Sequence, residues 1–150
     1  MSVVQRNTPL VQMFALALGT IYLLVGVLGF LPPLRGGVLM GVMGPSEGLL
    51  LGIFAVNWFH NLAHILIGIA GLALYRSFAG SKAYALVLGI AYAGLFLLGV
   101  LSSSVGTLGG LLPLNGPDNI LHVLTALVAL AIYFTARIPE PEQGAAQSRG

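Results

Sequence analysis

Four long runs of apolar residues constrain the fold of this chain more than any other feature. They extend from about residue 10 to 31, within 49 to 75, from about 83 to 101, and from about 118 to 136. A helix needs about 20 mostly apolar residues to cross a bilayer core of about 30 Å. Open strand edges cannot satisfy their backbone hydrogen bonds in lipid, whereas helices can. We therefore expect an all-α membrane protein, a four-helix transmembrane bundle.

The composition supports a lipid environment. Hydrophobic residues make up 57% of the chain and charged residues only 7%, whereas a soluble domain carries about 25% charged residues. The chain has no cysteine, which excludes disulfides, thiolate nucleophiles and sulfur-ligated metal centres. It also has no basic run interleaved with aromatic residues, so a nucleic-acid partner is not expected. The bilayer is the first partner that the composition indicates.

Basic residues near the ends of the spans predict the orientation. Four of them fall on one side of the predicted membrane and one on the other: Arg6, Arg76, Lys82 and Arg137 against Arg35. Cytoplasmic loops carry an excess of Lys and Arg. The N and C termini are therefore both expected in the cytoplasm.

The same reasoning divides the chain into regions. Residues 1–137 are predicted to form the four-span domain. Residues 138–150 are rich in Pro, Glu, Gln, Ser and Gly, a composition too polar to fold alone, and are predicted to be a disordered cytoplasmic tail. The glycine-rich loop 32–48 and the loop 102–117 are expected on the outer side.

The four spans contain an internal repeat. An offset of 70 residues aligns the first span with the third, and an offset of 58 aligns the second with the fourth. Four of five asparagines, four of five tyrosines and two of three histidines then pair: Asn57 with Asn115, Asn61 with Asn119, Tyr22 with Tyr92, Tyr75 with Tyr133, and His64 with His122. We expect two repeated helical hairpins, about 10–76 and 82–136, related by a two-fold axis along the membrane normal. The first span therefore belongs to the mature fold and is not a signal peptide.

The repeated motif Asn-x-x-(His/Asp)-Asn-x-x-His leads into the second and fourth predicted helices. It runs from Asn57 to His64 in one copy and from Asn115 to His122 in the other. Residues four apart share a helix face, so His60 pairs with His64, and Asp118 pairs with His122. We expect both faces to meet near the outer side of the membrane, between the second and fourth helices.

Two ligand chemistries suit this motif, and we expect a His-based binding protein. A divalent transition metal would take three imidazoles and one carboxylate: His60, His64, Asp118 and His122. Alternatively, His64 and His122 alone would ligate one haem iron. Neighbouring amides would then fix the orientation of the imidazoles: Asn57, Asn61, Asn115 and Asn119. Ionisable residues at membrane depth are costly and are therefore functional candidates.

The same residues also fit a structural role. Asn57, Asn115 and Asp118 stand where helices begin, and Asn and Asp are preferred N-caps. Polar side chains such as His64 and His122 hold transmembrane helices together. In this alternative the His/Asn cluster only clamps the helices, and the protein is a structural or accessory subunit that meets a membrane protein or a second copy of itself. A small transporter is a weaker alternative. The sequence shows no nucleophile–base pair or phosphate loop that would indicate an enzyme.

The chain resembles a bacterial membrane protein family, the domain of unknown function 4383. The resemblance rests on Asn61-x-x-His64, on Asp118-Asn119-x-x-His122 and on the short four-span length. It covers nearly the whole chain except the tail. It implies a multi-span bacterial membrane protein and contributes no catalytic residues. We expect the protein to be a multi-pass protein of the inner membrane.

Overall fold

The computed structural model describes residues 8–31, 48–101 and 111–138. These residues form four helices and one short hairpin, in the order α1 (Leu10–Leu28), β1 (Gly48–Leu50), β2 (Phe54–Val56), α2 (Trp58–Leu74), α3 (Phe78–Leu101) and α4 (Gly116–Thr135). A helix lies in each of the four apolar runs, so the predicted helical class is confirmed. The predicted loop 32–48 and tail 138–150 lie almost entirely outside the described residues.

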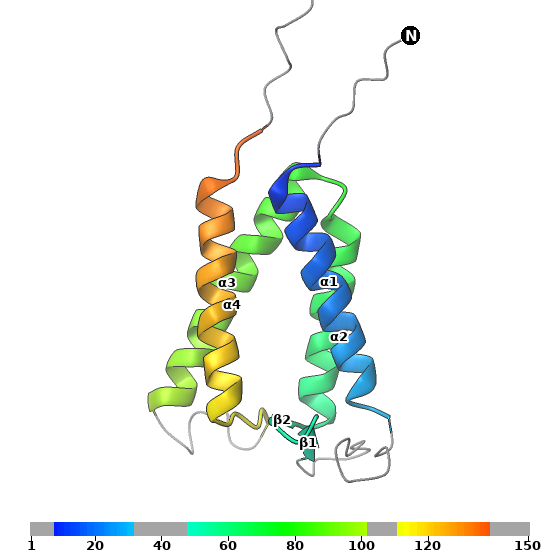
Figure 1. Ribbon diagram of the computed structural model, residues 1–150, viewed down its shortest axis with the longest axis vertical. Coiled ribbons are helices and arrows are strands. Elements are labelled where there is room, and N and C mark those ends of the chain that lie inside the picture. Colours follow the sequence, from blue (N-terminus) through cyan, green and yellow to red (C-terminus); the bar gives the residue numbers. More distant parts are fainter. Residues whose placement is uncertain (1–7, 32–47, 102–110, 139–150) are drawn as a thin grey trace, which may run out of the picture.

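The four helices pack as two pairs, α1 with α2 and α3 with α4 (Figure 1). The beginning of α1 and the end of α4 lie at one end of the molecule, opposite the β-hairpin. At this end the side-chain amide of Gln12 donates to the carbonyl of Tyr75 (2.9 Å), which joins the start of α1 to the end of α2. Lys82 donates to the carbonyl of Ala136 (3.3 Å) and joins α3 to α4 in the same way.

Glycines allow α1 and α2 to approach closely. A Cβ atom on Gly71 would lie 2.8 Å from the Cα of Gly19, and a Cβ on Gly19 would lie 2.9 Å from the backbone nitrogen of Leu72. Close backbone contact at small residues is a usual way for helices to associate in lipid, where burial from water gives no driving force. The first helix pair is therefore held by backbone-to-backbone packing.

The β-hairpin was not predicted. Gly48 lies opposite Val56 in the antiparallel ladder, and a tight turn joins the strands, with φ of 54° at Leu51 and 69° at Gly52. Residues 49–56 are almost all apolar and continue directly into the apolar run of α2. Periodicity therefore could not separate strand from helix there, and α2 begins only after Asn57.

The exterior of the helices indicates a membrane protein. Three helices, α1, α3 and α4, are long and apolar enough to cross a membrane, with mean hydropathies of 2.1, 2.2 and 1.5. The remaining helix, α2, is apolar but has only 17 residues. Large apolar side chains such as Leu66, Val87 and Leu127 are more than half exposed. Polar side chains such as His122 and Asn61 are buried inside, so the apolar exterior suits contact with lipid.

Candidate functional site

Two asparagines begin the helices that carry the repeated motif. The side-chain oxygen of Asn57 accepts a hydrogen bond from the backbone N–H of His60 (2.8 Å). Asn115 accepts in the same way from the N–H of Asp118 (3.0 Å). The carboxylate of Asp118 in turn accepts from the N–H of Asn115 (3.2 Å), which completes a capping box. The N-cap interpretation of Asn57 and Asn115 is therefore confirmed, and Asp118 takes the third helical position of the box.

The same two asparagines also connect the helix pairs. The amide nitrogen of Asn57 donates to the carbonyl of Leu111 (2.9 Å), and that of Asn115 donates to the carbonyl of Ile53 (2.7 Å). An asparagine amide offers both an acceptor and donors, so one side chain can cap its own helix and bind the opposite segment. We call these two hydrogen bonds the asparagine bridges.

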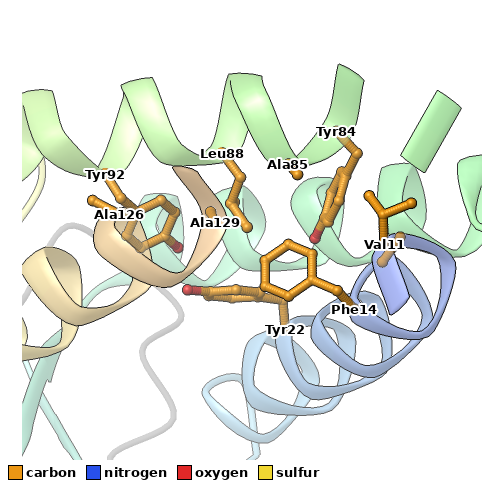
Figure 2. Close-up of a cluster of buried hydrophobic side chains, with 10 residues drawn as sticks. Val11, Phe14, Tyr22, Tyr84, Ala85, Leu88, Tyr92, Ala126 and Ala129 are labelled. Atoms are coloured by element: carbon orange, nitrogen blue, oxygen red, sulfur yellow. The ribbon is translucent and has the colours of Figure 1, made fainter. Parts of the chain in front are cut away.

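A chain of five buried rings crosses the molecule near the asparagine bridges. His60 lies 4.5 Å from His64 between ring centroids, and His64 lies 5.2 Å from Tyr22 on α1. Tyr22 lies 5.6 Å from Tyr92 on α3, and Tyr92 lies 5.0 Å from His122 on α4. All five side chains are buried, and Figure 2 shows the hydroxyl ends of Tyr22 and Tyr92 facing one another. We call this arrangement the ring chain; it links all four helices.

Two further asparagines pack on glycines instead of on imidazoles. The amide of Asn61 donates to the carbonyl of Gly29 (2.8 Å), and a Cβ on Gly29 would collide with the Asn61 side chain. A Cβ on Gly99 would collide with Asn119 in the same way. These contacts give Asn61 and Asn119 a role in helix packing, with the amide of Asn61 directed at backbone and not at a histidine.

Several buried polar atoms have no hydrogen-bond partner among the described residues. They are the Nδ1 atoms of His60, His64 and His122, the side-chain oxygens of Asn61 and Asn119, and the hydroxyl of Tyr84. Leaving such a group unpaired costs about 1–3 kcal/mol. The ring chain therefore contains unused hydrogen-bonding capacity, and these atoms are where a ligand or water would bind.

The comparison with protein families decides the affiliation of the chain. A family model described as "Domain of unknown function (DUF4383)" matches residues 12–135. The chain belongs to the DUF4383 family. No curated protein and no solved structure matches it. The matched range contains both asparagine bridges and the whole ring chain of this DUF4383 protein.

The predicted four-ligand metal centre does not assemble in the described part of the DUF4383 chain. Among residues 8–31, 48–101 and 111–138, no group of three or more His, Asp or Glu side chains could hold a metal ion. One oxygen of Asp118 accepts hydrogen bonds from the backbone of Ala55 (3.0 Å) and Asn115 (3.2 Å), which holds the carboxylate against backbone. His60 and His64 pack together on α2, whereas His122 packs on Tyr92.

The predicted haem arrangement also lacks support from this geometry. The ring contacts that connect His64 to His122 pass through Tyr22 and Tyr92. No contact between the two imidazoles themselves is seen among the described residues.

Sequence reasoning missed the tyrosines of the site. Tyr22 and Tyr92 form the centre of the ring chain, and the hydroxyl of Tyr22 lies 3.5 Å from that of Thr125 on α4. A signal for them was present, because the two tyrosines occupy equivalent positions in the predicted repeat of the DUF4383 chain.

Proposed function

We propose that this DUF4383 protein is a structural or accessory subunit of a membrane complex, in which the polar cluster clamps two repeated hairpins together. The observation that carries the proposal is the pair of asparagine bridges. Asn57 binds the carbonyl of Leu111, and Asn115 binds the carbonyl of Ile53. The two donor residues, 57 and 115, are 58 positions apart, and so are the two acceptor residues, 53 and 111. The polar motif thus supplies reciprocal contacts between the halves.

The ring contacts support the repeat in this proposal. His64 packs on Tyr22 of its own helix pair, and His122 packs on Tyr92 of the other pair. The histidines correspond at the offset of 58 and the tyrosines at the offset of 70. The contact between Tyr22 and Tyr92 then lies on the proposed two-fold axis, where equivalent residues meet.

We include α2 as a fourth span. At about 1.5 Å per residue, its 17 residues cover about 26 Å, and spans as short as about 17 residues occur. Arg76 follows the end of α2, and Arg137 follows the end of α4. Lys82 lies in the first turns of α3. An excess of basic residues marks the cytoplasmic side, so both termini are proposed to lie inside a bacterial inner membrane.

The outward faces supply the surface for a partner. They carry large apolar side chains, including Leu24, Ile69, Val87 and Val128, each at least half exposed. Most polar residues of the motif are buried, and Asn115 and Asn119 are half-buried. A partner would therefore meet this protein through apolar contacts within lipid, and a membrane protein or a second copy would suit them.

Unfolding measurements on the purified, full-length protein test this proposal. His64→Ala and His122→Ala should each lower the thermal midpoint, because each removes a ring from the buried chain. Leu124→Ala is a matched control on α4, since Leu124 is 53% exposed, and should change the midpoint little. If both histidine variants melt like the parent protein, the rings do not hold the hairpins together.

A second candidate function, a His-based metal or haem site, is favoured by one observation. The Nδ1 atoms of His60, His64 and His122 are buried without a partner in the described part of the chain. An absorption spectrum with elemental analysis tests this candidate. A Soret band would favour a haem site, and about one metal ion per chain would favour a metal site. Either signal should disappear in His64→Ala and in His122→Ala. A colourless, metal-free, folded protein that also resists reconstitution would exclude it.

A further inference from the structure

A groove lies at the opposite end of the molecule from the asparagine bridges. It has a volume of about 240 Å³ and lies between the start of α1, the start of α3 and the end of α4. Apolar side chains line most of it, including Val11, Phe78 and Ile132, and Arg137 is the one charged residue in the lining. The groove is therefore an apolar surface with a cation at the end of α4.

A second cation contacts the residue that precedes Arg137. The ammonium of Lys82 donates to the carbonyl of Ala136 (3.3 Å), a residue that also lines the groove. It also lies 5.1 Å above the ring of Tyr133. Asp118, the one acidic residue among those described, lies in the first turn of α4, at the other end of that helix. Within the described residues, no carboxylate neutralises this pair of cations.

The volume and charge of the groove indicate which kind of ligand it binds. The volume is below the roughly 300–1,000 Å³ of small-molecule pockets, so it suits a segment of an acyl chain better than a complete cofactor. Basic sites between transmembrane helices attract anionic lipid headgroups. We propose that this groove binds one anionic phospholipid, with its phosphate at Lys82 and Arg137 and an acyl chain against Val11, Phe78 and Ile132.

Arg76 provides a matched control at the same end of the molecule. Its guanidinium donates to the hydroxyl of Tyr75 (2.9 Å) and lies 5.5 Å from that ring. It does not line the groove. Removing this cation therefore changes the net charge as much as removing Arg137 does, without changing the proposed site.

Native mass spectrometry on the full-length protein in detergent tests the proposal, with phosphatidylglycerol and phosphatidylcholine as probes. One basic residue near anionic lipid contributes about a fivefold change in affinity, equivalent to roughly 1 kcal/mol. Phosphatidylglycerol should thus bind at least fivefold more tightly than phosphatidylcholine. Arg137→Gln and Lys82→Gln should each reduce that affinity about fivefold, and Arg76→Gln less than twofold. Thr135→Phe should weaken binding by filling the groove, because Thr135 is an exposed part of its lining.

Two controls show whether a change in lipid binding comes from the groove itself. Water-soluble glycerol phosphate carries the same anionic group without acyl chains and should not compete. Thermal unfolding of Arg137→Gln and Arg76→Gln should match that of the parent protein, so that the difference in binding between them does not come from a loss of folding. Equal binding of both lipids, equal effects of Arg137→Gln and Arg76→Gln, or full competition by glycerol phosphate would overturn the proposal.

Discussion

The amide nitrogen of Asn57 lies 2.9 Å from the carbonyl oxygen of Leu111 and joins the start of α2 to the segment that leads into α4. The oxygen of the same amide caps α2 by accepting from the N–H of His60. Few side chains have a donor and an acceptor on one planar group. This double use explains why asparagine suits the position better than another N-cap residue such as serine or aspartate.

The packing of asparagine on glycine predicts a large effect of one methyl group. Gly99→Ala should lower the free energy of unfolding by about 1–3 kcal/mol, because overpacking costs this much and the new Cβ would collide with Asn119. Gly94→Ala on the same helix is the control, since a Cβ there meets nothing within 4 Å. Chemical denaturation in mild detergent measures both. Equal stability of the two variants would contradict the close contact at Gly99.

The unpartnered nitrogen of His64 predicts that an apolar ring can replace the imidazole. His64→Phe keeps a ring against Tyr22 and removes a buried Nδ1 that has no described partner. We expect it to change the free energy of unfolding by less than about 1.5 kcal/mol, as size-conserving apolar exchanges do. His64→Ala should cost about 3 kcal/mol through the cavity it leaves. Equal losses in both variants would show that the imidazole nitrogens make an essential contact.

The turn of the β-hairpin predicts a stabilising substitution. Leu51 has a φ of 54° and Gly52 a φ of 69°, while the N–H of Ile53 donates to the carbonyl of Leu50. Asn and Gly favour such turns, whereas leucine is strained there. Leu51→Asn should therefore raise the free energy of unfolding by up to about 1–2 kcal/mol, because a residue such as leucine pays roughly this cost in the left-handed conformation and asparagine tolerates it. Leu49→Asn, at an exposed strand position, serves as the control and should not stabilise the protein.

Sequence alone predicted the features that depend on residue type over a long window. The four apolar runs identified the four helices. The positions of Asn57 and Asn115 identified the N-caps of α2 and α4. These inferences succeed because hydropathy and capping are local and do not depend on how the helices face one another.

Sequence could not predict the features that depend on tertiary packing. The helical four-residue spacing placed Asp118 and His122 on one face, but Asp118 accepts from the backbone of Ala55 in the hairpin, which was itself not predicted. An apolar run hides the strands, because strand and buried helix share the same residue types. The position of Asp118 therefore followed from an element that periodicity does not reveal.

The asparagine bridges are tested most directly by a pair of capping-competent substitutions. Asn57→Ser and Asn115→Ser retain an N-cap acceptor but remove the amide donors that bind Leu111 and Ile53. Each should lower the free energy of unfolding by about 0.5–1.5 kcal/mol, the net contribution of one hydrogen bond. The loss should be larger for Asn57→Ser, because its bridge is half-buried, whereas that of Asn115 is exposed. The matched control, Thr20→Ser, changes an exposed hydroxyl whose hydrogen bond stays within α1.

The decisive measurement is therefore the free energy of unfolding of Asn57→Ser, Asn115→Ser and the double variant in detergent. If the two bridges together hold the hairpins in place, each single variant will lose stability, and the double variant will lose more than either one. If all three variants unfold like the parent protein and the Thr20→Ser control, the bridges do not hold the hairpins together and the structural role proposed for the cluster is wrong.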